Sequence, residues 1–301
     1  MTTVFLTGAS GQLGQAVAGE LLARGFEVAA LVRGAAFPQG CRPVLGSLEK
    51  LGEVAHEIAR ADAVIHLASA RSNQREEVIA KDVLGTARLL DAWRRGNFVY
   101  ASSQTVYGIP QGPLTETAPL QPVVWYDLGK IYNELQIAMA AAEGARGAGV
   151  SLRMAVLFGP VAKSKNAPQF HEMIYEACVR GNRFLLESEA ALEGYGTSFI
   201  GDRDLARAMA DSLKIAESGP YNVAGPFCTW KELIATIDRV AGTRSRFVFR
   251  AGAQPEAGEF RLPQSRSYVD SKKFEAATSF RAEQGLEELI ERFVALRKKA
   301  G

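Results

Sequence analysis

The sequence predicts an α/β protein built on a doubly wound parallel sheet. Apolar runs of strand length alternate with segments of helical periodicity over the first 160 residues, and a glycine-rich turn follows the first run. Because each pair of parallel strands needs a crossover, and crossovers are right-handed, this alternation favours a parallel sheet covered by helices on both faces. The predicted strands are 3–6, 27–32, 63–67, 98–101 and 151–158, and the predicted helices are 12–23, 48–59, 76–94 and 126–142.

The pattern changes after Gly159 and Pro160, where helices predominate and strands are short. We predict that residues 1–160 form the first domain, that the chain returns to its sheet near 197–224, and that residues 161–301 form a smaller, mainly helical lobe facing the substrate. Residues 251–258 have a loop-forming composition and are expected to be exposed. Helices are predicted at 168–180, 204–217, 230–240 and 283–298, and a short strand at 220–224.

Composition excludes several classes of function. The 301 residues are 47% hydrophobic, which supplies a sizeable core, and the net charge of +2 with no basic block beyond Lys298 and Lys299 argues against a nucleic-acid partner. His66 lies in an apolar run and is expected to be a core imidazole. The cysteines and histidines are too scattered for a metal site, so no metal is predicted, and the thiols are expected to be buried and free: Cys41, Cys178, Cys228, His56, His66 and His171.

Targeting signals are missing from the sequence as given. No basic-then-apolar leader precedes the first predicted strand, and no apolar stretch approaches the ~20 residues of a membrane helix. We therefore expect a cytoplasmic protein with no membrane partner.

The glycines of "VFLTGASGQLG" lie between the first strand and the first helix. Such a tight turn needs residues without Cβ, and a bare helix N-terminus offers free N–H groups and a positive dipole end to a diphosphate. A glycine triplet at the start of a strand-helix-strand unit predicts a dinucleotide-binding domain of the Rossmann type. The residues expected to contact the dinucleotide here are Gly8, Ser10, Gly11, Gln12, Leu13 and Gly14.

The end of the second strand bears on the choice of cofactor. An acidic residue at this point commonly binds the ribose 2′-hydroxyl of NAD, whereas a 2′-phosphate calls for arginine. The sequence reads "EVAALVRGAA", with Arg33 and no nearby acid after the strand. This favours NADP(H) over NAD(H), although a strand-end arginine that only reaches water would give the same pattern.

Tyr126 and Lys130 are four residues apart on a predicted helix, so their side chains share one face. A free phenol has a pKa of ~10, but a neighbouring ammonium group and a cationic nicotinamide ring would favour the phenolate. Such a tyrosine can take or give the proton of an alcohol while hydride moves to or from the cofactor. Ser102 and Ser103 end the predicted strand at 98–101, on the edge where ligands of such sheets bind, and one of them is expected to hold the reacting oxygen.

Taken together, these motifs resemble the extended short-chain dehydrogenase/reductase family, the NAD-dependent epimerases, dehydratases and related reductases. The matching segments span most of the chain: "TGASGQLG", "DAVIHLAS", "VLGTARLLDA", "YASSQTVYG", "LTETAPLQP", "YDLGK", "LRMAVLFGP", "FIGDRDLARA" and "YNVAG". The resemblance implies that Ser103 binds the reacting oxygen and that Tyr126 is the acid/base. It also implies that Lys130 holds the nicotinamide ribose and lowers the pKa of the phenol.

The same resemblance assigns further contacts. Leu67, Ala68 and Ser69 would line the cofactor. Tyr107 belongs to the "VYG" segment and is expected to have a positional role, or at most to form a wall of the substrate site. Arg71, just past "HLAS", is a candidate for a phosphate or substrate contact, although a solvated loop arginine is an equal reading.

Departures from the family pattern lie mainly in the substrate half. Val156 replaces an asparagine that contacts the diphosphate of nucleotide-sugar substrates, and Thr197 and Ser198 stand where an arginine usually binds the nucleotide. Losing charge-assisted bonds of ~1.5 to 3 kcal/mol each disfavours a diphosphate substrate. Two changes on the cofactor side, Ser47 for aspartate and Asp82 for asparagine, leave dinucleotide binding possible.

Three functions are consistent with these residues. The first is an oxidoreductase acting on a secondary alcohol or ketone of a small metabolite, and the second is an epimerase or dehydratase of a sugar or nucleotide sugar that uses a retained cofactor. The third is a non-catalytic sensor of NADP(H). The helices at 76–94 and 126–142 are rich in Ala and Leu and are expected to pair across a two-fold axis in a homodimer, unless these faces only pack on the sheet.

Overall fold

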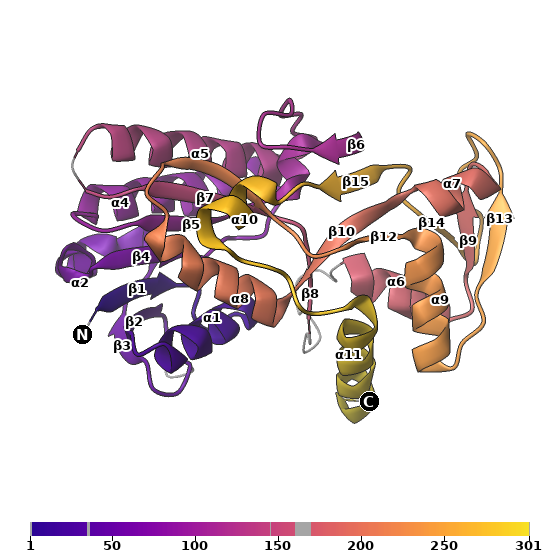
Figure 1. The fold of residues 1–301 in the computed structure, drawn as a ribbon, viewed down its shortest axis with the longest axis horizontal. Coiled ribbons are helices and arrows are strands. Elements are labelled where there is room, and N and C mark those ends of the chain that lie inside the picture. The colour runs from indigo at the N-terminus through magenta and orange to yellow at the C-terminus, as the bar shows by residue number, and fades with distance from the viewer. Residues whose placement is uncertain (1, 35–36, 145, 160–169, 301) are drawn as a thin grey trace.

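A seven-stranded, all-parallel sheet forms the first domain (Figure 1). The computed structural model describes residues 2–34, 37–144, 146–159 and 170–300. The strand order is β3-β2-β1-β4-β5-β7-β11. From β1 the chain adds strands first on one side, as β2 and β3, and then on the other, beginning with β4. The strands are β1 (Thr3–Thr7), β2 (Glu27–Val32), β3 (Arg42–Leu45), β4 (Ala63–His66), β5 (Phe98–Ser103), β7 (Gly149–Met154) and β11 (Gly219–Val223).

Alternate side chains of each strand point to opposite faces of this sheet, and helices cover both faces. Val4 and Leu6 pack on one side with α1 (Gln12–Ala23) and α8 (Asp202–Asp211), whereas Phe5 packs on the other. That second face is covered by α2 (Ala55–Arg60), α4 (Leu84–Ala92) and α5 (Trp125–Ala142). The predicted doubly wound fold is confirmed. The expected return of the chain is made by β11, which pairs with β7, whereas residues 196–201 join a different sheet.

Several elements differ locally from their predicted form. The helix expected at 76–94 is α3 (Arg75–Glu77), a π-helical segment η2 (Val78–Val83) and α4, and the one expected at 48–59 is a 3₁₀ segment η1 (Leu48–Val54) followed by α2. The single strand expected at 151–158 is two strands, because the chain leaves the main sheet at Ala155 and continues as β8 (Val156–Phe158) beside β10. The strand β3 was not predicted, since only one of its four residues is buried.

The second lobe contains two further sheets. In the first, β12 (Phe227–Thr229), β10 (Gly196–Gly201), β15 (Arg266–Val269) and β6 (Gln111–Leu114) follow one another, and β8 pairs with β10. The other sheet is β13 (Arg246–Phe249), β9 (Arg183–Leu186) and β14 (Glu259–Arg261). The helices of the lobe are α6 (Phe170–Val179), α7 (Glu189–Gly194), α9 (Trp230–Ala241) and α11 (Leu286–Ala300), and the remaining short helices are η3 (Gln104–Tyr107), η4 (Ser212–Lys214) and α10 (Lys272–Thr278).

Most predicted helices of this lobe are present with shifted ends. The helix expected at 168–180 is α6, and residues 168 and 169 of that prediction lie outside the described residues. Residues 251–258 form the exposed connection that the composition indicated. The sheet of β9, β13 and β14 was not predicted as such, because its three- and four-residue strands are too short to show a period.

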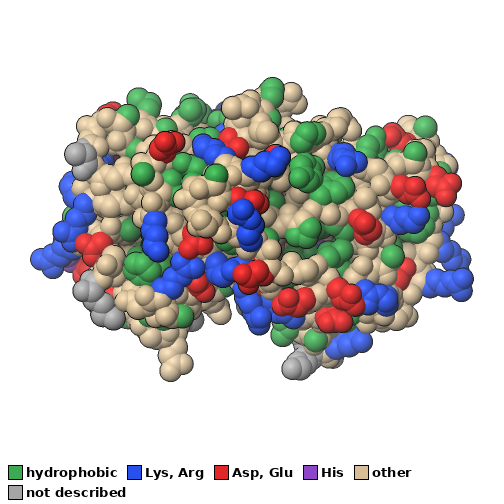
Figure 2. Space-filling model, viewed as in Figure 1, with side chains coloured by type: hydrophobic (Ala, Val, Ile, Leu, Met, Phe, Trp, Pro, Cys, Tyr) green, Lys and Arg blue, Asp and Glu red, His purple; other side chains and the backbone are tan. Residues whose placement is uncertain are grey.

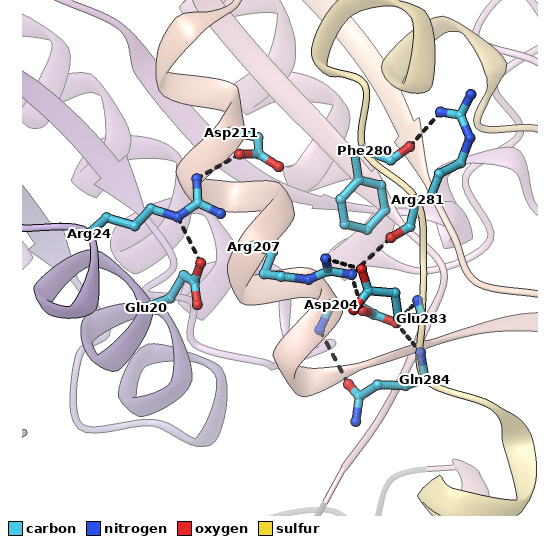
Figure 3. A network of polar contacts seen from close by, with 9 residues as sticks. All are labelled: Glu20, Arg24, Asp204, Arg207, Asp211, Phe280, Arg281, Glu283 and Gln284. Carbon is cyan, nitrogen blue, oxygen red and sulfur yellow. Dashed lines mark hydrogen bonds and ion pairs between the residues drawn. The ribbon is translucent and has the colours of Figure 1, made fainter.

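A polar network attaches the C-terminal segment to the first domain (Figure 3). Arg207 of α8 forms ion pairs of 2.7 Å with both Asp204 and Glu283. Asp204 Oδ2 accepts a hydrogen bond from the backbone N–H of Gln284 (2.8 Å), and Gln284 Oε1 accepts one from the backbone N–H of Asp204 (3.2 Å). These reciprocal bonds satisfy N–H groups in the first turn of α8 and fix the chain just before α11.

The surface charges are mixed, and the thiols agree with the sequence prediction. On the face drawn in Figure 2, cationic and anionic side chains are interspersed. Within the described ranges, no helix is long and apolar enough to cross a membrane. The three cysteines are buried and free, as predicted.

Candidate active site

A cavity of about 1070 Å³ lies at the carboxyl ends of β1, β4 and β5. The order of the sheet reverses between β1 and β4, and in open α/β sheets ligands bind at such a switch point. The glycine loop, β8, the start of α6 and the start of α8 all line the cavity, and Gln12 of the loop and Asp202 of α8 both lie close to Gly159. The cavity therefore joins the two lobes at the place where the sequence analysis expects both cofactor and substrate.

The glycine loop has the tight geometry that the sequence predicted. Gly8 has a φ of +74°, and a Cβ on it would lie 2.8 Å from the backbone nitrogen of Ala68. A Cβ on Gly14 would lie 2.0 Å from the carbonyl oxygen of Gly8. Any side chain at Gly8 or Gly14 would thus push backbone against backbone, so these two glycines allow α1 to begin directly beneath the loop.

The N-terminus of α1 is open to an anion. Gly11 precedes the helix and provides no side-chain cap. The first turn of the helix contains no acidic residue. Ser10, Gln12 and Leu13 line the cavity, and both polar atoms of the Gln12 side chain are buried without a hydrogen-bond partner among the described residues. Free backbone N–H groups, a positive dipole end and an unpartnered amide suit the diphosphate of a dinucleotide.

The segment after β4 forms the next wall of the cavity. Leu67 and Ser69 line it, while the backbone of Ala68 packs against Gly8. Asp82, only 5% exposed, accepts hydrogen bonds from the backbone N–H of Ala70 (2.7 Å) and from Ser69 Oγ (3.1 Å). The aspartate at position 82 therefore holds the loop that lines this part of the cavity.

His66 at the end of β4 lies behind this wall, as a core imidazole. Its Nδ1 lies 2.7 Å from Thr7 Oγ1, and its Nε2 lies 3.0 Å from Thr86 Oγ1. Burial, together with the positive charge of Lys130, lowers the pKa of His66 to about 3. The ring is therefore neutral at physiological pH and takes no part in proton transfer to a ligand.

Lys130 is buried beneath the cavity floor. Its Nζ donates a hydrogen bond to the carbonyl oxygen of Ala101 (2.7 Å) and lies 4.8 Å and 5.3 Å from the ring centres of Tyr100 and Tyr126. Burial alone would lower the pKa of Lys130, but the oxygens of Tyr100, Tyr126 and Asp82 oppose it and the net shift is upward. The ammonium group therefore stays charged beside the Tyr126 ring.

Helix α5 presents Tyr126 and Lys130 to the cavity on one face. The side chain of Asp127 fixes the start of this helix, because its Oδ2 accepts hydrogen bonds from the backbone N–H groups of Val123 (3.0 Å) and Val124 (3.1 Å). Tyr126 is partly exposed and lines the cavity. The capped start of α5 thus places the partly exposed phenol of Tyr126 and the buried ammonium group of Lys130 along the same cavity.

Ser103 completes the set. It lines the cavity, and its Oγ accepts hydrogen bonds from the backbone N–H of Thr105 (3.2 Å) and from Thr105 Oγ1 (3.0 Å). A hydroxyl has one hydrogen and two acceptor positions, so these two bonds leave the hydrogen of Ser103 available to a ligand. Ser103 can therefore cap η3 and bind a ligand at the same time.

Ser102 and Tyr107 have a different place. Ser102 is fully buried and donates a hydrogen bond to Glu134, which also forms a buried ion pair of 2.7 Å with Arg153. Tyr107 is 2% exposed, donates to Asn222 Oδ1 (2.7 Å) and accepts from Arg153 Nη1 (3.0 Å). The expectation that Tyr107 at most forms a wall of the substrate site is corrected here, because its hydroxyl is bound within the core beneath β5; the positional reading agrees with this placement.

The remaining predicted residues divide into two groups. Arg71 and Val156 line the cavity, and Arg71 has a φ of +51°, which is strained for a residue with a side chain. Arg33 is exposed directly after β2. It is not among the described residues that line the cavity, but its positive charge acts on the carboxyl of Glu49.

Sequence reasoning missed several residues that line the cavity, among them Gln104, Phe170 and Arg203. Gln104 had a local signal, since it directly follows Ser103. Phe170 lies far along the chain, at the start of α6, so no spacing rule could have placed it.

Comparison with known proteins bears on the family of the chain. The sequence profile described as "NAD dependent epimerase/dehydratase family" matches residues 4–224. A 4-hydroxy-2-methyl-3-oxo-4-farnesyl-3,4-dihydroquinoline-1-oxide ketoreductase of Stigmatella aurantiaca is 34% identical over 155 residues, covering 46% of each protein. A decarboxylating sterol-4-alpha-carboxylate 3-dehydrogenase of Dictyostelium discoideum is 27% identical over 178 residues, covering 53% of this chain and 54% of the relative.

The matches to these curated relatives span about half the length of each. Among solved structures, the UDP-glucose 4-epimerase of Thermus thermophilus in complex with NAD covers 100% of both chains, with a TM-score of 0.79 and 26% identity. Sequence profile and structure agree on the resemblance drawn from the motifs. The chain belongs to the NAD-dependent epimerase/dehydratase family.

Proposed function

We propose that the protein is an NAD(P)-dependent oxidoreductase that interconverts a secondary alcohol and a ketone on a small, uncharged or singly charged molecule. One observation carries the proposal: Ser103, Tyr126 and Lys130 line the same cavity as the glycine loop. A proton donor, a hydrogen-bond donor and a cation thus face one space with a site for a diphosphate. Proton transfer and hydride transfer need that combination.

Each side chain has a separate task in the proposed reduction. Ser103 donates its free hydrogen to the carbonyl oxygen of the substrate, and Tyr126 gives that oxygen a proton as negative charge develops on it. The ammonium group of Lys130, beside the Tyr126 ring, stabilises the phenolate that remains. A nicotinamide dinucleotide held by the glycine loop and Lys130 would provide the hydride-transfer chemistry in either direction.

The lining of the cavity supports a redox reaction on an uncharged or singly charged molecule, because it combines apolar side chains with a few charged ones, among them Arg71, Asp202 and Arg203. The apolar ones include Met154, Val156, Leu157 and Phe170. Thr197 stands where family members acting on nucleotide sugars are expected to have an arginine. The two curated relatives are named as a ketoreductase and a dehydrogenase.

Epimerisation or dehydration remains the second candidate. It is favoured by the full-length likeness to a UDP-glucose 4-epimerase. Net cofactor turnover separates the two reactions. A panel of ketones, hydroxyketones and nucleotide sugars is incubated with NADPH or NADH, and the absorbance of the reduced nicotinamide is followed. We expect stoichiometric oxidation of the cofactor by a ketone. Conversion of a nucleotide sugar with no net change in the cofactor would contradict the redox proposal.

For the cofactor itself, we propose a preference for NADP(H). Arg33 ends β2 with no acid beside it in sequence, which suits a 2′-phosphate. Glu49 is a nearby group that opposes this preference. Its own backbone N–H and the Ser47 hydroxyl lower the pKa of the Glu49 carboxyl, and the charge of Arg33 lowers it further. Glu49 would therefore compete with a 2′-phosphate for Arg33.

The proposed assembly is a homodimer through α5. Tyr132, Leu135 and Met139 are 57%, 60% and 65% exposed and, spaced by three and four residues, form one apolar face; Leu84 of α4 is also exposed. A second copy of this chain would bury these faces in a two-fold helix bundle. Light scattering should give twice the chain mass for the parent and the single mass for Leu135→Glu, with Leu45→Glu, an exposed leucine on β3, as control. A monomeric parent would contradict the proposal.

The cytoplasm is the proposed location. Three free, buried thiols are typical of a reducing compartment. Cell fractionation tests this, and recovery of the protein from an oxidising compartment would contradict it.

A further inference from the structure

Gln104, the residue directly after Ser103, is among the residues that line the cavity and is 9% exposed. Its Nε2 donates a hydrogen bond to Thr197 Oγ1 (3.0 Å). Its Oε1 has no hydrogen-bond partner among the described residues. Buried polar atoms of native proteins are almost always paired, so an unpaired acceptor beside a binding cavity indicates a missing partner.

Thr197 determines which end of the amide is the acceptor. Its Oγ1 donates to the carbonyl oxygen of Ser198 (3.3 Å), so it must accept from Gln104. The NH₂ group of Gln104 therefore faces Thr197, and the oxygen is left for another donor. Thr197 is itself 4% exposed on β10, which holds this arrangement rigidly from the second lobe.

The position of Gln104 in the chain places this acceptor next to the chemistry. Ser103 caps η3, and Gln104 is the first residue of that segment. The two residues line the same cavity, and their side chains have complementary hydrogen-bonding groups, because Ser103 offers a hydrogen and Gln104 an unpartnered oxygen. The carbonyl oxygen of a plain ketone can accept a hydrogen bond from Ser103, but it has no hydrogen to donate to Gln104.

We infer that Gln104 Oε1 accepts a hydrogen bond from a hydroxyl or N–H group that the substrate carries close to its reacting carbonyl. The preferred substrate class is thus a ketone with a neighbouring donor, such as a hydroxyketone, rather than a plain ketone. This inference rests on the proposed redox function for its kinetic test. Gln104 is a specificity-determining residue, and Thr197 is its positioning residue.

The kinetic test compares 2-hydroxycyclohexanone with cyclohexanone as substrates of the enzyme with NADPH. The parent should have a kcat/KM about tenfold higher for the hydroxyketone, corresponding to about 1.4 kcal/mol. Gln104→Met and Thr197→Val should lose this ratio, whereas Thr197→Ser, which keeps the hydroxyl, should retain it. A parent that reduces both ketones equally, or a ratio that survives in Gln104→Met, would overturn the inference.

A second measurement does not depend on the reaction. Gln104→Met removes an unpaired buried oxygen together with one hydrogen bond, so the Tm of the ligand-free protein should stay the same or rise. The matched control is Gln284→Met, since Gln284 is 7% exposed with both ends of its amide bonded, and its Tm should fall. A comparable fall for Gln104→Met would show that Oε1 is already satisfied within the protein and would overturn the inference.

The two measurements separate the failure of this inference from the failure of the proposed function. If neither ketone is reduced, the redox proposal loses support. In that case a crystal structure of the protein decides the role of Gln104. An ordered water within the cavity, bonded to Oε1, would support an open acceptor site, and a protein group bonded to Oε1 would exclude it.

Discussion

The two ends of the cavity differ in how they are built. The cofactor end consists of one continuous loop, Gly8 to Gly14, and short segments that follow adjacent parallel strands. The part that we propose binds the substrate is assembled from β8, η3 and the start of α6, with β10 behind them. The first end depends on backbone geometry and the second on individual side chains. We therefore expect substitutions to be tolerated less at Gly8 and Gly14, where a Cβ would meet backbone, than at side chains elsewhere in the lining.

The largest expected effect distinguishes two tyrosines of the site. Tyr126→Phe should lower kcat/KM by about 10²- to 10⁴-fold, the range for loss of a positioned acid/base. Tyr107→Phe should change kcat/KM far less but lower the free energy of unfolding by about 1 to 3 kcal/mol, because Asn222 and Arg153 each lose a buried partner. Steady-state kinetics and urea unfolding measure the two. A Tyr126→Phe protein as active as its parent would favour a non-catalytic sensor.

The second prediction tests the backbone of the cofactor end with two glycines of α1. Gly14→Ala should raise the dissociation constant of the cofactor on the order of a hundredfold, about 2.7 kcal/mol, because its Cβ would lie 2.0 Å from the Gly8 carbonyl oxygen. Gly19→Ala meets no atom within 4 Å and should instead stabilise the helix by up to ~1 kcal/mol. Fluorescence titration with NADPH and thermal unfolding measure these effects. Equal cofactor affinities would rule out the proposed contact.

A third pair of variants sharpens the choice of cofactor. Arg33→Ala should weaken NADPH binding by about 1.5 to 3 kcal/mol, the usual loss of a charge-assisted bond, and leave NADH binding nearly unchanged. Glu49→Gln should strengthen NADPH binding by less, because it removes only the competitor for Arg33. Tighter binding of NADH than of NADPH by the parent would contradict the preference.

The last prediction compares one histidine from each lobe. Burial lowers the pKa of both His66 and His171 to about 3, helped by Lys130 and Arg297 respectively. Between pH 6.5 and about 3 only the unfolded chain carries these protons, so stability falls as the pH drops below 6.5. From pH 7 to pH 5 each histidine should cost roughly 2 kcal/mol of unfolding free energy.

Urea unfolding at several pH values measures that slope. His66→Gln and His171→Gln should each remove the part of the pH dependence that comes from the replaced histidine. His56→Gln is the control, since the His56 side chain is 59% exposed. An unchanged slope in both buried variants would show that the two rings are not the source.

The comparison of the two ends also explains what the sequence could predict. Gly8, Gly11 and Gly14 lie within one turn, and Tyr126 and Lys130 within one helix, so local spacing and periodicity located them. The seven-stranded sheet followed from the same alternation, apart from the exposed strand β3. These features share one property: their signal lies within a few neighbouring residues.

The substrate end and the core behind it have no such signal. Whether Ser102 or Ser103 faces the cavity depends on where η3 begins, which only the structure reveals. Tyr107 was placed too near the substrate because its partners, Arg153 and Asn222, lie 46 and 115 residues away in the chain. The bond between Gln104 and Thr197 crosses 93 residues and joins the two lobes. Such contacts are set by tertiary packing rather than by local pattern.

A crystal structure of the protein with NADPH tests the central claim most directly. We expect the diphosphate at the N-terminus of α1, the ribose of the nicotinamide beside Lys130, and the reactive carbon of the ring facing the hydroxyl groups of Ser103 and Tyr126. A cofactor bound elsewhere, or a nicotinamide ring turned away from those two hydroxyl groups, would contradict the account.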